Sequence, residues 1–423
     1  MPMSQLRTTP YWWDTAPPPP MERPAAVPKK ADVVVIGSGY TGCHAALVLA
    51  RAGRSVVMLD KGRIGEGCST RNGGQVSHSV KPGFDTLARR HGAETARAIL
   101  AEGVASRAFV ERFVTQEGIA CDFRACGRFH AAASPRAFAA LAKLADGDRI
   151  TLVPRDRQRE ELGTDWYHGG AVFHDHACLD PGFYHAGLVE RLDAAGVVLA
   201  PQCPALAIDE RPDGVTVTTP LGPIEARDVM LATNGYSGAL SPWHQNRIVP
   251  IGSYIIATEA LDPALVKRIF PTGRIASDSR RVVYYYRPSP DGKRVIFGGR
   301  VSAGETDPQS AARRLRDVMV QLFPELGPAS ISHSWMGFVG YTFDALAHTG
   351  ARGRVHHAMG YCGSGVGMAS YLGHKAGLRI LGRPEGETAL TTPDFPTSPL
   401  YRGRPWFLPA AVETYRLLDR LGL

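Results

Sequence analysis

The stretch "DVVVIGSGYTGCHAALVLARAG" (residues 32–53) has the pattern of a strand, a glycine-rich turn and a helix. Its first part is a run of apolar residues, which is typical of a strand buried on both faces of a parallel sheet. Gly37, Gly39 and Gly42 follow in the spacing GxGxxG. The first glycine permits the tight turn, the second lets the backbone approach a pyrophosphate, and the third lets helix and strand pack closely. The stretch therefore predicts a dinucleotide-binding βαβ unit, with the pyrophosphate at the helix N-terminus.

The next strand of this unit, "SVVMLD" (55–60), ends in Asp60. A carboxylate at this position accepts hydrogen bonds from a ribose 2′-hydroxyl and repels a 2′-phosphate. The unit therefore suits FAD or NAD rather than NADP.

A second glycine-rich loop, "GYCGSGVGM" (360–368), lies between a predicted strand and a predicted helix. Two such loops indicate either two bound nucleotides or the two ends of one. The other expected elements are, in chain order, helices over 85–147, a three-stranded meander over 203–231, strands over 248–300, and helices over 309–322 and 409–421.

The chain has 423 residues, which is enough for two or more domains. Its net charge is +8, but the basic residues are scattered among acidic ones, so we expect a basic surface and no nucleic-acid partner. No apolar run approaches the ~20 residues of a membrane span, and the N-terminus lacks the apolar core of a signal peptide. We therefore expect a cytoplasmic protein with no membrane association; the sequence does not define its oligomeric state.

The seven cysteines are odd in number, widely spaced and without a CxxC pair. This usage favours neither a disulfide framework nor a zinc site. The histidine clusters "HDH" (174–176) and "HH" (356–357) show no further acidic or cysteine residue at metal-ligand spacing. We expect no metal.

Five stretches resemble, in this order, the D-amino-acid oxidase (DAO) superfamily of FAD-dependent oxidoreductases, and most closely its gamma-glutamylputrescine oxidase-like branch. They are "YTG" (40–42), "RNGGQ" (71–75), "YYR" (285–287), "GG" (298–299) and "GYxGxGV" (360–366). In that family both glycine loops flank one cofactor, so the resemblance implies a single extended FAD. The stretch "VMLATNG" also resembles the second nucleotide signature of this class of flavoprotein.

The expected fold class is therefore α/β combined with α+β. A two-dinucleotide-type Rossmann-like FAD-binding domain is interleaved with a smaller substrate domain built on an antiparallel sheet. The expected boundaries are a Pro-rich extended arm at 1–30, the FAD-binding domain at 31–88, 150–240 and 326–385, the substrate domain at 89–149 and 241–325, and a helical tail at 386–423.

The resemblance implies that FAD is bound by residues of the two glycine loops, of the loop "RIGEGCSTRNGGQVSH" (63–78) and of the meander. These are Gly37, Ser38, Gly39, Tyr40, Thr41, Gly42, Asp60, Lys61, Cys68, Ser69, Thr70, Arg71, Asn72, Gly73, Gly74, Gln75, Ala205, Thr233, Asn234, Gly235, Gly363, Ser364, Gly365, Val366, Gly367 and Met368.

We expect this FAD to be held non-covalently. Relatives of the sarcosine oxidase type attach the flavin to a cysteine upstream of the last glycine loop, and the matching stretch 332–350 has none. Dimethylglycine dehydrogenase-like relatives use a histidine in the early loop, where Asn72 stands here. Cys68 and Cys362 lie in loops expected near the flavin and are the thiols that could react instead.

The resemblance also implies the reaction, which is oxidation of the C–N bond of a secondary amine, N-substituted amino acid or polyamine derivative. Hydride passes to flavin N5, the imine is hydrolysed, and O2 reoxidises the flavin with release of H2O2. This chemistry needs no acid–base dyad, so we assign no general base. Three alternatives stay open: a dehydrogenase that passes electrons to a carrier, a tRNA-modifying flavoprotein and a non-catalytic one.

Aromatic walls would exclude water and lower the pKa of the substrate amine. In "VVYYYRP", Tyr284 and Tyr286 share one face of a strand, and Tyr285 shares the other with Arg287. We expect the first pair to face the flavin cavity. The complete set of expected pocket residues is Tyr254, Tyr284, Tyr286, Arg300, Trp335 and Cys362.

Two differences from sarcosine oxidases argue against N-methylglycine as the substrate. Gly367 stands where those enzymes bind the substrate carboxylate with lysine, and Ile296 stands where they carry a lysine associated with oxygen activation. The second departure also weakens the choice of oxidase over dehydrogenase. Arg300 could supply the positive charge for a carboxylate.

Overall fold

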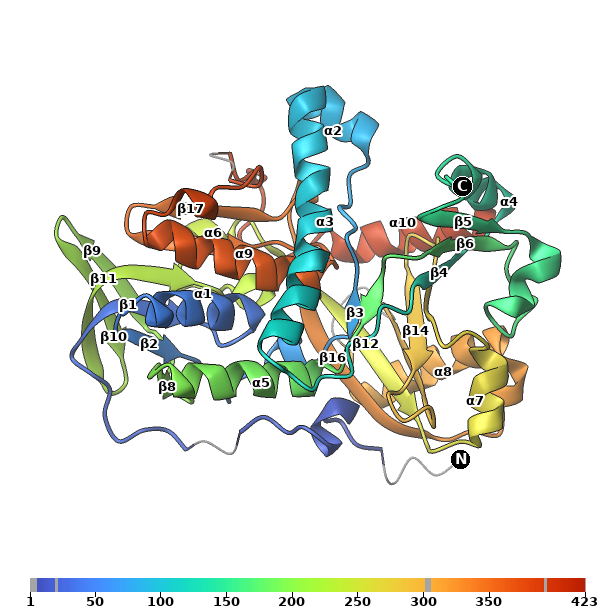
Figure 1. Cartoon of the computed structure of the whole chain (residues 1–423), viewed down its shortest axis with the longest axis horizontal. Helices are drawn as coiled ribbons and strands as arrows, with labels where there is room; N and C mark the ends of the chain where they lie inside the picture. The colour runs from blue at the N-terminus through green and yellow to red at the C-terminus, as the bar shows by residue number, and fades with distance from the viewer. Residues whose placement is uncertain (1–5, 20–21, 301–305, 392–393, 423) are drawn as a thin grey trace.

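The computed structural model describes residues 6–19, 22–300, 306–391 and 394–422, which form two units on separate eight-stranded sheets (Figure 1). The first sheet has the order β17-β18-β11-β1-β2-β8, and the strands from β18 to β8 run parallel. Its strands are β1 (Lys30–Ile36), β2 (Val56–Leu59), β8 (Val198–Ala200), β11 (Gly222–Leu231), β17 (His348–Arg352) and β18 (Val355–Met359), with β9 (Ala207–Arg211) and β10 (Gly214–Thr219) completing the meander.

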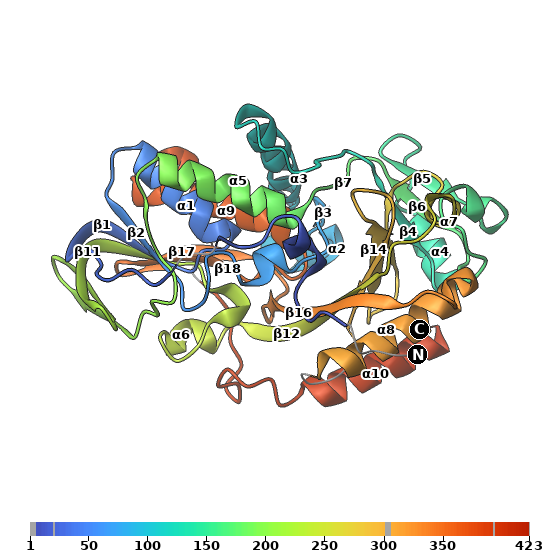
Figure 2. The same ribbon diagram turned by 90° about the horizontal axis from the view of Figure 1, so that it is seen from below.

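Burial on both faces explains the apolar run of β1. Val33 and Val35 pack into the core under the helices, whereas Val34 and Ile36 pack against the meander on the other face. Figure 2 shows the helices gathered on one side of this sheet. They are α1 (Tyr40–Arg51), α5 (Pro181–Ala194), α9 (Gly365–Ile380) and α3 (Ala93–Gln116), the last with α2 (Phe84–His91) packed on it.

The second sheet has the order β16-β12-β15-β14-β13-β4-β6-β5 and is antiparallel except between β13 and β4. Its strands are β4 (Arg128–Ala131), β5 (Ile150–Val153), β6 (Gly170–Phe173), β12 (Val249–Thr258), β13 (Ile275–Asp278), β14 (Tyr284–Pro288), β15 (Val295–Gly299) and β16 (Ile331–Tyr341). The helices α4 (Pro135–Ala142), α7 (Pro263–Ile269), α8 (Pro308–Leu322) and α10 (Leu408–Leu421) belong to this half, and α6 (Pro242–Gln245) lies beside the first sheet. A third, two-stranded sheet pairs β3 (Gln75–Val76) with β7 (Ala177–Cys178) between the halves.

The expected fold class is confirmed, but the sheets divide the chain differently from the expected boundaries. The strands β5, β6 and β16 belong to the second sheet, although 150–240 and 326–385 are the ranges expected for the FAD-binding domain. Helix α3 packs its apolar face into the core beneath the first sheet's helices, although 89–149 is expected in the substrate domain. These assignments depend on contacts between distant parts of the chain, which local patterns do not contain.

The described part of the N-terminal segment is anchored rather than simply extended. Residues Tyr11–Asp14 form a 3-10 turn that buries Trp12 completely. Trp12 packs on Ile255, Ile296 and Trp335 of the second sheet, and its indole N–H donates to the carbonyl of Asn72 at 2.8 Å. Residues 1–5 and 20–21 of the expected arm, and 392–393 and 423 of the expected tail, lie outside the described residues.

Candidate active site

A cavity of about 1440 Å³ is lined by residues of both large sheets. On the first sheet's side it reaches the carboxyl ends of β1, β2 and β11, which is where ligands bind in open α/β sheets. Its volume exceeds the ~300–1,000 Å³ of an ordinary small-molecule pocket. The cavity therefore has room for an extended cofactor and a substrate together.

The glycines of the first loop are required by close backbone approach. A Cβ atom on Gly37 would lie 2.8 Å from the carbonyl oxygen of Ala232, and Gly37 also has a positive φ of 105°. A Cβ atom on Gly42 would overlap the carbonyl oxygen of Gly37. Side chains at these two positions would therefore displace the turn that forms this end of the cavity.

Two helix N-termini reach the cavity, and neither is capped by the side chain of its own preceding residue. The residues that precede α1 and α9 are Gly39 and Ser364, and neither caps its helix with a side-chain hydrogen bond. Free backbone N–H groups at such ends bind phosphate and other anionic oxygens. A hydrogen bond of 2.5 Å between Thr41 Oγ1 and the Tyr361 hydroxyl joins the two loops. This arrangement fits the two ends of one dinucleotide.

Asp60 lines the same end of the cavity. Its carboxylate accepts hydrogen bonds from the Ser38 N–H at 3.0 Å, the Ser38 hydroxyl at 2.5 Å and the Gly62 N–H at 2.9 Å. These donors hold the carboxylate at the end of β2, where it can also accept from a ribose hydroxyl.

The loop before β3 is fixed by its own side chains. The Asn72 amide donates to the carbonyl oxygens of Cys68 and Ser69 and accepts from the Gly74 N–H at 2.8 Å. The Ser69 hydroxyl accepts from the N–H of Tyr40, the first residue of α1, at 2.9 Å. The loop is thereby tied to the helix N-terminus at which the pyrophosphate is expected.

Cys68 and Cys362, the two thiols that could react with the flavin, differ in their position relative to the cavity. Cys68 lines the cavity, and burial raises the pKa of its thiol to about 11, against the effect of Arg71. The Cys362 thiol donates to the Gly360 carbonyl at 3.1 Å, does not line the cavity, and has its pKa raised by burial. Both thiols stay protonated, so non-covalent FAD remains the prediction.

The structure brings most of the expected cofactor residues together on the cavity wall: Gly37, Ser38, Gly39, Tyr40, Thr41, Asp60, Lys61, Cys68, Ser69, Arg71, Asn72, Gly73, Gln75, Ala205, Thr233, Asn234, Gly363, Ser364, Gly365 and Val366. Six others do not line the cavity: Gly42, Thr70, Gly74, Gly235, Gly367 and Met368. Gly367, for example, packs against Ser106 of α3, where a Cβ atom would lie 3.2 Å from the hydroxyl. The side chain of a lysine at position 367 would therefore leave the backbone toward α3 and not toward the cavity.

The expected substrate wall needs correction. Tyr285 lines the cavity, whereas Tyr284 and Tyr286 do not. The alternation along β14 is as expected, but the face carrying Tyr284 and Tyr286 packs into the core beneath α8. The sequence of a strand does not show which of its faces a helix will cover.

The other expected pocket residues are also absent from the described cavity wall. Tyr254 and Trp335 are 1% exposed in the cores of the second unit, and Ile296 lies beside Trp335. Cys362 faces away as described above, and Arg300 at the end of β15 is not among the described lining residues.

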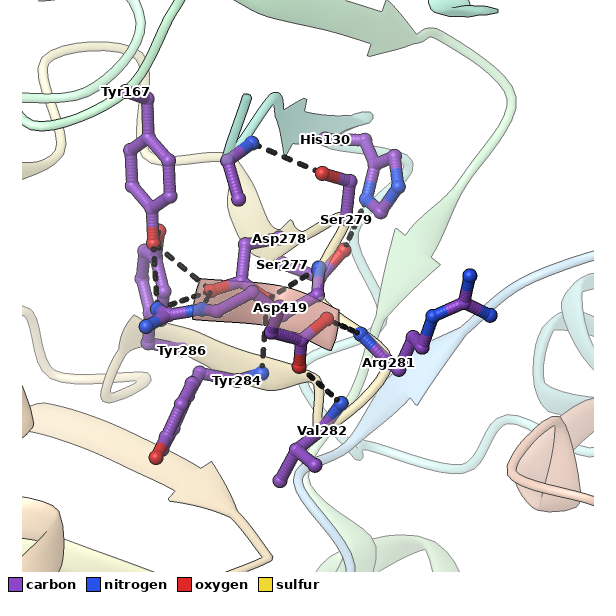
Figure 3. A network of polar contacts seen from close by, with 12 residues as sticks. His130, Tyr167, Ser277, Asp278, Ser279, Arg281, Val282, Tyr284, Tyr286 and Asp419 are labelled. Carbon is purple, nitrogen blue, oxygen red and sulfur yellow. Dashed lines mark hydrogen bonds and ion pairs between the residues drawn. The ribbon is translucent and has the colours of Figure 1, made fainter. Parts of the chain in front are cut away.

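Sequence reasoning missed the polar wall that the second sheet contributes. It comes from β4, β13 and the loop after β13, and its members are Arg128, His130, Ser277, Asp278, Ser279, Arg280 and Arg281. Figure 3 shows Asp278 at the centre of a hydrogen-bond network with Tyr167 and the N–H of Tyr284. Arg280 forms an ion pair with Asp278, whose pKa is nevertheless raised by burial.

The same wall is held from below by helix α10. The Asp419 carboxylate accepts from the backbone N–H groups of Arg281 at 2.8 Å and Val282 at 3.1 Å (Figure 3). A C-terminal helix therefore positions the loop that follows β13 at the cavity.

Arg128 is the most distinctive of these residues. Burial lowers the pKa of its guanidinium to about 10, and its Nε atom is buried without a hydrogen-bond partner. Its guanidinium lies over the Phe173 ring at 4.9 Å. Burial, together with Arg128 and Lys81, also lowers the pKa of His130 to about 3, and this ring is hydrogen-bonded to the Ser277 hydroxyl. A neutral His130 and a buried cation suit anion binding rather than proton abstraction.

One cluster outside the cavity has metal-ligand character. Ligand atoms of His78, Asp175 and His176 all lie within 4.8 Å of one another. The cationic side chains of Arg128 and Arg107, after burial, help to lower the pKa of His176, and the same charges oppose a bound cation. The absence of a metal therefore remains the prediction. None of the helices in the described ranges is long and apolar enough to cross a bilayer.

Comparison with known proteins identifies the family. The family model "FAD dependent oxidoreductase" (DAO) matches residues 32–377. "Probable oxidoreductase OrdL" of Rhizobium meliloti is 31% identical over 93% of both chains, and "Gamma-glutamylputrescine oxidoreductase" of Escherichia coli is 28% identical over 93% of both.

Among solved structures, glycine oxidase from Geobacillus kaustophilus is similar with a TM-score of 0.71 and 16% identity, covering 88% of this chain and 99% of that one. The L-proline dehydrogenase from P. horikoshii is similar with a TM-score of 0.68 and 18% identity, covering 91% and 99%. These two likenesses show the fold. The chain belongs to the DAO family of FAD-dependent oxidoreductases, as its five ordered motifs indicated, and FAD is its cofactor.

Proposed function

We propose that this protein oxidises the C–N bond of an amine that also carries a carboxylate, such as an N-substituted amino acid or a γ-glutamyl amine. When bound, FAD accepts the hydride from the carbon beside the amine nitrogen, and the resulting imine is hydrolysed. The gamma-glutamylputrescine oxidoreductase relative supports an amine substrate. The observation that supports a carboxylate on the substrate is the presence of Arg128 on the cavity wall.

The charges of the second sheet's wall support an anionic substrate group. Among the described lining residues of this wall, the carboxylate of Asp278 is already paired with Arg280. The Nε atom of Arg128 is buried without a hydrogen-bond partner, and Asp175, the carboxylate that acts on Arg128, is hydrogen-bonded to His78. Partial burial strengthens the attraction of this guanidinium for an anion. A free polyamine would instead bring further positive charge to this wall, which is unfavourable.

Aromatic side chains support the amine half of the proposal. Tyr285, Phe338 and Tyr341 line the cavity together with Met336. Apolar walls disfavour the ammonium form, so the substrate amine reaches the neutral state that hydride transfer requires. No lining residue has to act as a general base in this scheme.

We propose O2 as the electron acceptor, with H2O2 as the product. Ile296, which is 2% exposed in a core, stands where sarcosine oxidases carry the lysine associated with oxygen activation. Lys81 supplies a cation to the cavity from a different segment, and a nearby cation stabilises negative charge developing on oxygen.

Matched amines test the substrate class. The flavin of the anaerobic holoprotein is followed by absorbance against putrescine and γ-glutamylputrescine, and against N-methylpropylamine and 4-(methylamino)butanoate. We expect bleaching by the carboxylate-bearing member of at least one pair, and faster bleaching than by its partner. Bleaching only by carboxylate-free amines would contradict the substrate class, and no bleaching across a broader amine panel would contradict the function.

Substitution of Arg128 tests the residue that carries the proposal. We expect R128L to raise the half-saturating concentration of the carboxylate-bearing amine at least tenfold, because a charge-assisted hydrogen bond is worth roughly 1.5–3 kcal/mol. R136L removes an exposed arginine from nearby α4 and serves as the matched control. Readmission of air then decides the acceptor: H2O2 release is expected, and slow reoxidation without peroxide would indicate a dehydrogenase.

A further inference from the structure

We propose that Cys126 and Cys178 form a reversible disulfide when the protein meets hydrogen peroxide. Their Sγ atoms lie 3.6 Å apart, and both cysteines are unbridged. This pair lies outside the cavity wall and plays no part in the proposed oxidation of an amine.

The backbone holds the two thiols together. Arg124 and Cys178 exchange both backbone hydrogen bonds, at 2.8 and 2.9 Å, as an antiparallel bridge. The pairing continues with a bond of 2.9 Å from the Gly127 N–H to the His176 carbonyl. Cys126 follows Arg124 by two residues, so its side chain points to the same side and lies diagonally across from Cys178. Closing the bond therefore requires side-chain rotation and a small shift rather than refolding of the segment.

Two guanidinium groups, one fully and one partly buried, favour a thiolate at this place. Arg124 and Arg287 each have an Nη2 atom that is buried without a hydrogen-bond partner, and Arg287 is 1% exposed. Asp122 is the carboxylate near both, at 3.2 Å from Arg124 and 3.9 Å from Arg287. Asp180 also interacts with Arg287, but the charged groups that act most strongly on the Cys178 thiol are the two arginines and Asp122, so the balance at this sulfur is positive.

The two cysteines have different roles in this field. The hydrogen bond from Cys126, with Arg287 and Arg124, lowers the pKa of the Cys178 thiol despite its burial. The same hydrogen bond raises the pKa of Cys126. Cys178 is therefore the nucleophile, and Cys126, which is partly exposed, is the resolving thiol.

The chemistry needs one small oxidant and balances in two steps. The Cys178 thiolate attacks one oxygen of H2O2, an S–O bond forms as the O–O bond breaks, and hydroxide leaves. The Cys126 thiol then attacks the sulfenic sulfur, an S–S bond forms as the S–O bond breaks, and hydroxide again leaves. The protons lost by the two thiols convert both hydroxides to water. Two thiols and one H2O2 thus give one disulfide and two waters, and a thiol reductant reverses the oxidation.

The test uses the holoprotein with added H2O2, so it does not depend on the amine reaction. After exposure, free thiols are alkylated and the protein is analysed by intact mass and by non-reducing peptide mapping. We expect an intact mass that lacks two of the alkyl groups carried by the alkylated reduced protein, a crosslinked peptide pair containing Cys126 and Cys178, and loss of both signals when dithiothreitol is added before alkylation. An unchanged mass, or a crosslink between other cysteines, would overturn the proposal.

Serine variants separate the two roles. C126S is expected to accumulate a sulfenic acid at Cys178 that dimedone traps, and C178S is expected to show no crosslink and no dimedone adduct at Cys126. C203S replaces a buried cysteine in the core on the meander side of the first sheet, and this variant should form the same crosslink as the parent protein. Absence of dimedone labelling at Cys178 in C126S, with the flavin spectrum intact, would exclude Cys178 as the nucleophile.

Discussion

At the scale of single residues, Gly42 is the described glycine at which an added methyl group would approach another atom most closely. Its Cβ atom would overlap the carbonyl oxygen of Gly37, which belongs to the turn at one end of the cavity. We expect G42A to lose stability by about 1–3 kcal/mol through overpacking and to bind FAD at least tenfold more weakly. Flavin content after purification and FAD titration of the apoprotein measure this effect.

The matched control is G83A, because nothing lies within 4 Å of a Cβ atom built on Gly83. G83A should keep the flavin content and melting temperature of the parent protein. Equal FAD affinity of G42A and G83A would show that the close approach of helix and turn is not needed for binding.

The three consecutive tyrosines of β14 give a second prediction at this scale. The Tyr285 hydroxyl is hydrogen-bonded to Ser253 at 2.9 Å on the cavity wall, whereas the Tyr286 hydroxyl donates to Tyr167 at 3.0 Å inside the core. We expect Y285F to change kcat or KM for the amine substrate, with little change in melting temperature. Y286F should leave kcat and KM unchanged and lose about 1 kcal/mol of stability with its hydrogen bond. The opposite pattern would restore Tyr286 to the cavity wall.

These tyrosines also show how far sequence reasoning reaches. The period of two along β14 predicts correctly which side chains share a face, but the face that α8 covers depends on packing. Arg128 and His130 are missed because helices are expected over 85–147, whereas Arg128–Ala131 forms strand β4 of the second sheet. Gly37 and Asp60 do lie on the cavity wall, because their positions are set by backbone geometry within one βαβ unit.

At the scale of elements, the 3-10 turn at Tyr11–Asp14 joins the N-terminal segment to both halves of the molecule. Trp12 is fully buried against the second sheet and donates to the Asn72 carbonyl in the loop that lines the cofactor end. We expect W12A to lose about 3–5 kcal/mol, as for other buried aromatic truncations, and to purify with less FAD. Thermal unfolding with and without excess FAD measures both effects.

W406A is the control for this element, because Trp406 is 65% exposed. That variant should match the parent in melting temperature and in flavin content. If W12A lowers stability but keeps full FAD occupancy, the segment supports the second sheet alone and does not order the Asn72 loop.

The helices and strands also show which parts of the fold the sequence predicts and which parts it does not. Helices α8 and α10 and the end of the meander lie within a residue of their expected positions. Each has a clear local period and clear turn residues. The meander begins at Ala207, a few residues later than expected. Helix α3 lies within the expected helical region, but its period does not reveal on which sheet it packs. Strand β16 is not among the expected elements. Fold class was therefore predictable, and the division of the chain between sheets was not.

At the scale of the whole molecule, both halves bury histidines in the neutral form. Burial lowers the pKa of His44, His130, His176, His185, His244, His333, His357 and His374. In the unfolded chain these rings titrate near their ordinary value of about 6.5. Below that pH the unfolded state binds more protons than the folded state, so stability falls as pH falls.

His244 allows this acid sensitivity to be measured for one ring outside the cavity. Burial, with Arg247 and Arg352, lowers its pKa to about 4, and its Nδ1 atom is hydrogen-bonded to the Ser241 hydroxyl at 2.7 Å. The histidine therefore reduces stability between pH 6.5 and 4, and by pH 5.5 the loss is about 1.4 kcal/mol. We expect H244Q, measured by urea unfolding at fixed FAD concentration, to lose about that much less than the parent between pH 7.5 and 5.5. H174Q, at an exposed histidine, should keep the parent's pH dependence, and an unchanged pH dependence in H244Q would mean that the His244 ring is protonated in the folded protein.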